Sequence, residues 1–362
     1  MIRGRERLSV FKRLFWFFLA ALALAGPVRA VGTHAPEAEI GLAAVPTGQT
    51  VTYSFRPDGD GPFPTVLFLQ GYPCRSAAPE DSQNFARNRL ITTFADAGYL
   101  VHIAEKPGLG GGNSTKACED LLYHEEVAAF SAVLDQLRAS PEVDPDRLFI
   151  FGHSMGGQTA PLIARGRNVR GIVTYGIHAK SWFEFLIDLA REQAERIGID
   201  PVVVDRETGM MIPFLYDLMI AKRDWDFLVE QHREALGIGI LRADGEYLNG
   251  RHYRFWADLN DASLVENWAA YDGNVLALYG EYDIASISEE GAERIASIVN
   301  RHHPGRGEAE IIARTGHGFA TLDAPFEDYL ALRFSPDWSG EQEASLFNDA
   351  LADRVVRWMD ES

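Results

Sequence analysis

The stretch LFIFGHSMGGQTAPLI, residues 148–163, places a single serine, Ser154, between glycines. An apolar run typical of a buried strand precedes this serine, and a helical pattern follows it. In a sharp turn from strand to helix the serine hydroxyl points outward, and the residues two positions away must be small, as Gly152 and Gly156 are. The bare Gly-x-Ser-x-Gly pattern occurs by chance in roughly one chain in ten of this length. It is therefore the flanking strand and helix that predict a nucleophile at Ser154.

A serine nucleophile needs a base to take its proton, and histidine is the usual base. His317 lies in the segment RTGHGF, between two glycines and directly after an apolar run that predicts a strand. His302 and His303 are alternatives, but they lie at the end of a predicted helix, on the opposite side of the expected sheet. The sequence therefore predicts His317 as the base.

The base in turn needs an acid that orients its ring. Asp283 lies in LYGEYDIAS, three residues beyond Gly280 and just past the end of a predicted strand. Glu281 and Asp323 are the alternatives, and a single acidic residue is most often a solvated surface group. The position after a strand favours Asp283.

The negative oxygen that forms during acyl transfer needs two backbone N–H donors. The first expected donor is Met155, directly after the nucleophile. The second is Tyr72, in the turn QGYPC at residues 70–74, where Gly71 leaves the approach unobstructed. The alternative is that this segment is an ordinary proline-containing turn.

Outside these motifs the chain alternates short apolar runs with amphipathic stretches. This alternation predicts a mostly parallel sheet covered by helices on both faces, with ligands bound beyond the carboxyl ends of the strands. The expected strands are residues 49–57, 64–71, 100–106, 146–152, 169–176, 274–280 and 308–315. The expected helices are residues 90–99, 120–140, 156–166, 289–303 and 341–359.

The motifs GHSMGG, GEYD and TGHGF resemble the nucleophile elbow, acid loop and histidine loop of the α/β-hydrolase superfamily. The resemblance extends from Gln49 to Met359, and the order Ser154, Asp283, His317 is the one expected of that sheet. It implies an α/β-hydrolase fold with a twisted sheet, and a serine hydrolase without metal or organic cofactor. The branches that cleave epoxides or halides use an aspartate nucleophile and fit less well. One departure is that members often carry His-Gly before the oxyanion residue, whereas this chain has Gln70 and Gly71 there.

Residues 178–271 interrupt the pattern after the sixth strand and are too long for a simple connection between two strands. They are mostly helical in pattern and predict a cap over the serine, with the hydrolase core formed by residues 31–177 and 272–362. We expect about three of the cap's aromatic side chains to line a substrate pocket, among Trp182, Phe185, Phe214, Tyr216, Trp225, Phe255 and Trp256. The cap's acidic residues are expected to face solvent. They include Glu184, Asp188, Asp217, Asp224 and Asp226.

The first thirty residues have a basic start, a 13-residue apolar run and a small residue at Ala30, which predicts a secretory signal peptide. An uncleaved membrane anchor is the alternative. Removing residues 1–30 changes the net charge from −18 to −23, because they carry six Lys or Arg and one Glu. Such a surface repels nucleic acid. An exported protein, periplasmic or extracellular, would allow Cys74 and Cys118 to form a disulfide, with two free buried thiols as the alternative.

These features together predict an exported serine hydrolase that forms an acyl-enzyme at Ser154 and acts on a small-molecule ester. A peptidase of the same fold, similar to an aminopeptidase and acting on a peptide, is the closest alternative. A catalytically silent binding protein is the alternative from another class. After signal cleavage no stable membrane anchor is expected, and the oligomeric state cannot be read from the sequence.

Overall fold

The computed structural model describes residues 37–238 and 241–362. The predicted signal peptide, residues 1–30, lies outside these ranges. None of the helices in the described part has both the length and the apolar composition that a membrane span requires.

The centre of the molecule is an eight-stranded sheet in the order β1-β2-β4-β3-β5-β6-β10-β11. β1 and β2 pair in antiparallel fashion, as do β2 and β4, and the remaining pairs are parallel. This mostly parallel sheet confirms the predicted fold class. Its strands are β1 (Glu39–Val45), β2 (Gly48–Phe55), β3 (Phe63–Leu69), β4 (Leu100–Ala104), β5 (Val143–His153), β6 (Gly171–Tyr175), β10 (Asn274–Gly280) and β11 (Gly307–Ile312).

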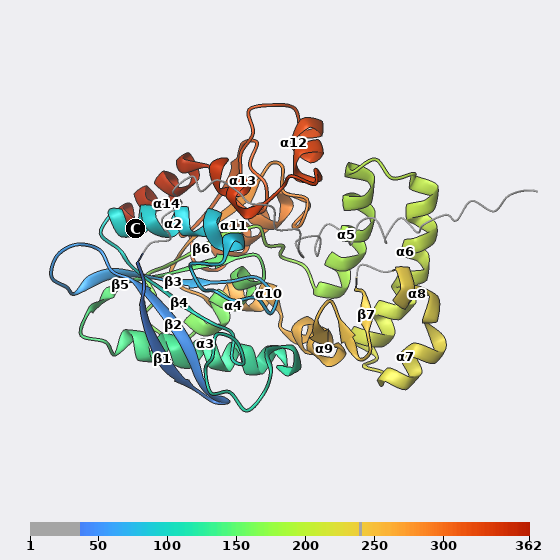
Figure 1. The fold of residues 1–362 in the computed structure, drawn as a ribbon, viewed down its shortest axis with the longest axis horizontal. Helices are drawn as coiled ribbons and strands as arrows, with labels where there is room; N and C mark the ends of the chain where they lie inside the picture. Colours follow the sequence, from blue (N-terminus) through green and yellow to red (C-terminus); the bar gives the residue numbers. More distant parts are fainter. Residues whose placement is uncertain (1–36, 239–240) are drawn as a thin grey trace, which may run out of the picture.

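Helices cover both faces of the sheet, as predicted. Alternate residues of β5 show this division, because Ile150 packs in one hydrophobic cluster and Phe151 in the other. In Figure 1 the helices α2, α13 and α14 lie above the sheet, and α3 lies below it. The helices of the core are α2 (Phe85–Asp96), α3 (Tyr123–Arg138), α4 (Met155–Ala164), α11 (Glu290–His302), α12 (Phe326–Arg333), α13 (Gly340–Ser345) and α14 (Asp349–Glu361).

Two expectations about the core need correction. The strand β1 is not among the predicted strands, because it lies at the edge and exposes its apolar residues Ile40 and Leu42. The single helix expected over 341–359 is two helices, α13 and α14. Asn348 separates them: its side-chain oxygen accepts a hydrogen bond from the Leu351 N–H at 3.3 Å and caps α14.

The segment between β6 and β10 forms a mostly helical insertion, most of which lies on the right of the sheet in Figure 1. It also contains a small three-stranded antiparallel sheet, which the helical pattern of the sequence did not indicate. Its helical elements are α5 (Trp182–Arg196), α6 (Pro201–Leu215), a π-helical turn (Tyr216–Ile220), α7 (Trp225–Gln231), α8 (Arg233–Ile238), α9 (Tyr253–Asp261) and α10 (Leu264–Ala270). Its strands are β7 (Ala243–Asp244), β8 (Tyr247–Leu248) and β9 (Arg251–His252).

Candidate active site

Ser154 lies in a strained turn between β5 and α4. Its backbone has φ 54° and ψ −129°, in a region that residues other than glycine rarely adopt. A Cβ atom at Gly152 would lie 2.6 Å from the Gly156 carbonyl oxygen, and one at Gly156 would lie 2.2 Å from the Leu69 carbonyl oxygen. Both positions therefore require glycine, as the sequence predicted. The turn is a nucleophile elbow in its geometry.

The side chains of His317 and Asp283 are joined by a hydrogen bond of 2.7 Å between Nδ1 and Oδ2. Asp283 is fully buried and also accepts hydrogen bonds from the Ser286 hydroxyl at 2.7 Å and from the Ala285 N–H at 2.7 Å. Burial on its own raises the pKa of Asp283, but the His317 ring and the hydrogen bonds from Ser286 outweigh burial and lower the pKa to about 2. The carboxylate is therefore ionised at neutral pH and fixes the Nδ1–H tautomer of His317.

The alternative acids and bases lie elsewhere. The Glu281 carboxylate accepts a hydrogen bond of 2.8 Å from the backbone N–H of Arg314, and the Asp323 carboxylate forms an ion pair with the Arg314 guanidinium. His303 bonds to a backbone carbonyl near the end of α10, and His302 is exposed at the end of α11. Of the residues considered, only Asp283 and His317 are brought together.

Two residues beside this pair were not singled out from the sequence. Gly176 has φ +68°, and a Cβ atom there would lie 2.8 Å from both Asp283 Oδ2 and His317 Nδ1. The His153 ring lies 4.7 Å from the His317 ring, and its Nε2 is 2.9 Å from the His317 carbonyl oxygen. Burial lowers the pKa of His153 to about 3, so this ring is neutral and donates from Nε2. Gly176 could have been identified from the sequence, because it is a glycine at the end of the strand predicted over residues 169–176.

Ser154 and His317 line the same cavity, which encloses about 750 Å³ including its opening to solvent. No hydrogen bond joins the Ser154 hydroxyl to the His317 ring in the described part of the chain. Catalytic hydrogen bonds of this kind often shorten only when a substrate is bound. The lining residues are Tyr72, Ser154, Gly176, Ile177, His178, Trp182, Phe185, Leu186, Leu189, Gln193, Leu241, Asn249, Trp256, Ala285, Ser286 and His317.

The wall of this cavity opposite the core comes from the insertion and is mostly apolar, with His178, Gln193 and Asn249 as its polar side chains. Trp182, Phe185 and Trp256 are the three of the seven predicted aromatic residues that line it. Of the other four, Phe214 and Phe255 are buried in the core of the insertion, whereas Tyr216 is about half exposed. Among the described lining residues there is no Asp, Glu, Lys or Arg.

The turn that was predicted to supply an oxyanion donor lies against Ser154. A Cβ atom at Gly71 would be 3.3 Å from Ser154 Cβ and 3.5 Å from Ser154 Oγ, so the backbone passes close to the serine. Tyr72 lines the cavity, and Met155 begins α4, where the N–H groups of the first turn have no partner within the helix. Gln70 donates to the Ala104 carbonyl at 3.1 Å and thereby ties this turn to β4.

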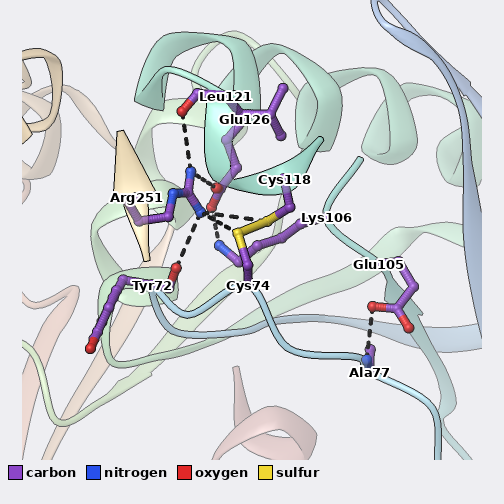
Figure 2. The surroundings of a disulfide bond; sticks show 9 residues. All are labelled: Tyr72, Cys74, Ala77, Glu105, Lys106, Cys118, Leu121, Glu126 and Arg251. Carbon is purple, nitrogen blue, oxygen red and sulfur yellow. Dashed lines mark hydrogen bonds and ion pairs between the residues drawn. A yellow bond between two sulfur atoms is a disulfide. The ribbon is translucent and has the colours of Figure 1, made fainter. Parts of the chain in front are cut away.

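Cys74 and Cys118 form a disulfide, as predicted, with their Cα atoms 5.8 Å apart (Figure 2). The bond joins the turn after β3 to the loop after β4, close to Tyr72. Within the described ranges, no group of three or more His, Cys, Asp or Glu side chains is arranged to hold a metal ion.

Comparison with known proteins agrees with this geometry at the level of the family. Residues 66–332, more than half of the chain, match the model of the alpha/beta hydrolase family. The chain belongs to the alpha/beta hydrolase family. No curated protein matches this hydrolase in a sequence search.

Three solved structures are similar to this alpha/beta hydrolase. DcsB in complex with its substrate analogue is 15% identical with a TM-score of 0.52, covering 90% of this chain and 99% of that chain. Est1E from Butyrivibrio proteoclasticus bound to ferulic acid is 13% identical with a TM-score of 0.51, covering 81% and 96%. The epoxide hydrolase VrEH1 from Vigna radiata is 14% identical with a TM-score of 0.50, covering 90% and 99%. At these identities the likeness shows the fold, and the reaction must be argued from the site.

Proposed function

We propose that this protein is a serine hydrolase that cleaves a carboxylic ester through an acyl-enzyme at Ser154. The observation that carries the proposal is the strained elbow of Ser154, which opens into the same cavity as a His317 ring bound to the buried Asp283. His317 takes the proton of the serine as base and returns it to the leaving group as acid. Asp283 holds the tautomer that leaves Nε2 free for this transfer.

The N–H groups of Tyr72 and Met155 are the proposed donors to the negative oxygen of the tetrahedral intermediate. Support comes from the close approach of Gly71 to Ser154 and from the place of Met155 at the start of α4. Two donors held in place before the reaction stabilise the charge as it develops, which is commonly the largest single contribution to such catalysis. Water then releases the acyl group by the same steps.

The insertion at residues 178–271 is the proposed cap, and it sets the class of acyl group. Its side chains supply an apolar wall without charged groups, formed by Trp182, Phe185, Leu186 and Leu189. A cavity of this composition suits an uncharged apolar acyl or alkyl group. We therefore propose short or medium uncharged esters as substrates.

A peptidase of the aminopeptidase type is the second candidate, and the acidic residues of the cap argue against it. Such an enzyme needs carboxylates that face the serine and hold a free ammonium group. None of the five acidic residues considered in the sequence lines the cavity. Four of them are engaged elsewhere: Glu184 with Ser181, Asp188 with Lys180, Asp217 with His232, and Asp224 with the Phe227 N–H.

Labelling with a fluorophosphonate probe tests the proposal, with Ser154→Ala as the control. The wild-type protein is expected to take up the probe at one site, and the variant is expected to take up none. A wild-type protein that is not labelled would identify a silent binding protein. The ratio of kcat/KM for a p-nitrophenyl acyl ester and an aminoacyl p-nitroanilide then separates the two enzymes. Anilide turnover that depends on a free α-amino group would replace the esterase with the peptidase.

A further inference from the structure

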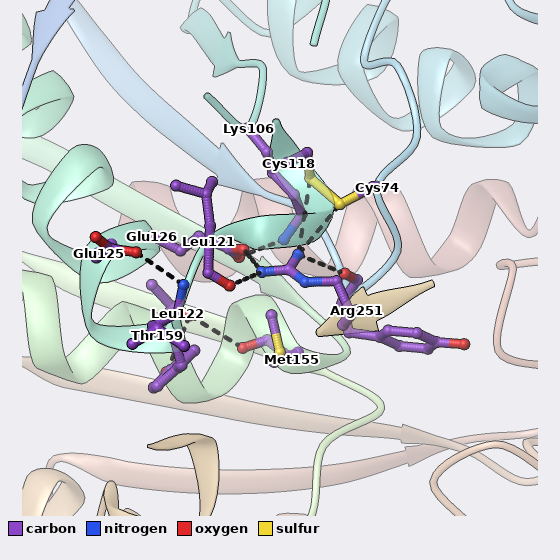
Figure 3. Close-up of polar contacts among 12 residues, drawn as sticks. Cys74, Lys106, Cys118, Leu121, Leu122, Glu125, Glu126, Met155, Thr159 and Arg251 are labelled. Carbon is purple, nitrogen blue, oxygen red and sulfur yellow. Dashed lines mark hydrogen bonds and ion pairs between the residues drawn. A yellow bond between two sulfur atoms is a disulfide. The ribbon is translucent and has the colours of Figure 1, made fainter. Parts of the chain in front are cut away.

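A buried charged cluster lies beneath the turn that carries Tyr72. Arg251, from β9 of the insertion, has a side chain with no exposure to solvent, and so does Lys106, after β4 of the core. Between them lies Glu126 of α3, which is bonded to Arg251 at 2.8 Å and to Lys106 (Figures 2 and 3). Burial on its own raises the pKa of Glu126, but Lys106 and Arg251 outweigh it and lower the pKa. The carboxylate is therefore ionised and holds both cations in place.

The Arg251 guanidinium also contacts the turn itself. Its Nη1 donates to the Tyr72 carbonyl oxygen at 3.2 Å and lies 3.5 Å from Cys74 Sγ and 3.8 Å from Cys118 Sγ. Its Nη2 lies 3.5 Å from the Leu121 carbonyl oxygen. In Figure 2, dashed lines run from the guanidinium to the Glu126 carboxylate, the disulfide, and the carbonyl oxygens of Leu121 and Tyr72. A planar group with a fixed fork of donors can hold these partners together, whereas a lysine ammonium cannot.

The aromatic ring of Tyr72 contacts a second residue of the insertion, Trp256. The Trp256 ring lies 5.7 Å from the Tyr72 ring. The carbonyl and the ring of Tyr72 are thus both fixed by residues of the insertion, and Pro73 restricts the backbone that follows. With these groups fixed, the backbone of Tyr72 has little freedom directly after Gly71, which approaches Ser154 closely.

We infer that Arg251 is a positioning residue for the oxyanion hole, and that through it the insertion completes the catalytic site. This inference rests on the proposed function, because it assumes that Tyr72 N–H is an oxyanion donor. Arg251 does not line the cavity and so does not touch the substrate. Its effect must therefore appear in the stabilisation of the transition state and not in the binding of the ester.

The test compares Arg251→Met with Arg251→Lys in the full-length protein. Removing one oxyanion donor outright costs roughly 10²–10³ in kcat, so loosening the turn is expected to lower kcat by about tenfold to a hundredfold. KM for the ester is expected to change by less than about threefold, because a group outside the cavity contributes no ground-state contact. The Ki of a trifluoromethyl ketone analogue, whose adduct places an oxyanion in the hole, is expected to rise in parallel with the loss in kcat/KM.

Arg251→Lys separates positioning from a merely structural role. A lysine keeps a positive charge beside Glu126, so the thermal midpoint is expected to stay closer to wild type than that of Arg251→Met. It lacks the second arm that reaches the Tyr72 carbonyl, so the loss of kcat is expected to remain. Recovery of wild-type kcat by Arg251→Lys would overturn the inference. This variant also supplies the test if Arg251→Met does not fold.

Arg354→Met is the matched control. Arg354 of α14 also has a largely buried side chain that binds two carboxylates, those of Glu308 and Glu310. Because α14 contributes no residue to the cavity, this variant is expected to lower the thermal midpoint without changing kcat or the Ki of the ketone.

The rate of fluorophosphonate labelling distinguishes failure of this inference from failure of the proposed function. Absence of labelling in the wild-type protein would contradict the proposed function itself. If the wild-type protein and Arg251→Met are labelled at the same rate, this result would contradict only the positioning role of Arg251.

Discussion

The two walls of the cavity are built in different ways. On the core side, Ser154, His317 and Gly176 are fixed by backbone geometry and by hydrogen bonds to a buried carboxylate. On the insertion side, Phe185, Leu189 and their neighbours are held by packing against one another. Displacing a reacting group by 1 Å costs about a hundredfold in rate, whereas one methylene group in an apolar pocket changes selectivity by only about tenfold to two-hundredfold. If the proposed function holds, the core wall governs whether reaction occurs, and the insertion wall governs which acyl group reacts.

The largest expected effect comes from removing a member of the core wall. Ser154→Ala or His317→Ala is expected to lower kcat by roughly 10⁴–10⁶, because the residues act as a unit. Asp283→Asn is expected to cost about 10⁴, because the amide favours the wrong tautomer of the histidine. Steady-state kinetics with a p-nitrophenyl ester measures these losses, and circular dichroism checks the fold. A damaging Glu281→Gln beside a harmless Asp283→Asn would show that the acid is assigned wrongly.

Gly176→Ala tests whether close packing behind the His317–Asp283 pair is needed. The new methyl group would lie 2.8 Å from both partners of their hydrogen bond, so kcat is expected to fall by about a hundredfold. Gly166→Ala is the matched control, because Gly166 has a similar φ of +71° but no heavy atom within 4 Å of the added methyl group. Equal losses of kcat in the two variants would assign the effect to backbone strain.

The insertion wall is tested by filling the cavity with Leu189→Phe. The larger ring is expected to lower kcat/KM for a medium-chain ester by about tenfold, while the value for the acetyl ester stays within about threefold. Val202→Phe is the control, since Val202 is 76% exposed on the same insertion. A uniform loss for all acyl lengths would mean that Leu189 supports the chemistry and not the selectivity.

The last prediction concerns stability in mild acid and not the rate of reaction. Burial lowers the pKa of His102 to about 4 and that of His178 to about 3, both below the ordinary value near 6.5. The unfolded chain therefore binds protons first as the pH falls below about 6.5, and stability is lost from there down to about pH 4 for His102 and about pH 3 for His178. We expect a loss of about 1 kcal/mol per pH unit for each such histidine, measured by urea unfolding between pH 7 and pH 5.

His102→Gln sharpens this measurement, because glutamine cannot ionise but keeps a polar group near Ser54, the present partner of His102 at 2.9 Å. The variant is expected to lose less stability between pH 7 and pH 5 than the wild-type protein. If the free energy of unfolding of the two proteins falls in parallel with pH, His102 does not contribute to the loss of stability in acid. Asp283, whose pKa is lowered to about 2, contributes only below about pH 4 and does not interfere.

The same division between the walls explains how much could be predicted from the sequence. Ser154, Asp283 and His317 each follow a strand of a parallel sheet, and the carboxyl ends of such strands meet at one edge. Their convergence could therefore be expected without knowing any packing detail. The number of aromatic residues on the insertion wall, about three, could be predicted from the sequence. Which aromatic residues these are depends on how α5 and α9 pack, and the periodicity of the sequence does not determine that packing.

Arg251 shows why the remaining contacts could not be predicted. Its partners Tyr72, Cys118 and Glu126 lie between 125 and 179 residues away in the chain. An arginine in a short polar segment is most often exposed, so nothing in the local sequence distinguishes a buried one. The strand β1 and the break before α14 were not predicted for a related reason. Each is stabilised by pairing or capping contacts and not by its own hydrophobic pattern.

The contact of Arg251 with the disulfide has a consequence for the order of assembly. Cys118 is fully buried, and the residue that covers both sulfur atoms comes 133 residues later in the chain. An oxidant needs access to the thiols, and Cys118 is most accessible before β9 packs against the core, so the bond is expected to form at that stage. In a chain that emerges from its amino end, both cysteines become available while the insertion is still to follow. Once Arg251 has packed, the bond is open to reductants only from the side of the partly exposed Cys74, so reduction of this disulfide should be faster when the insertion is detached.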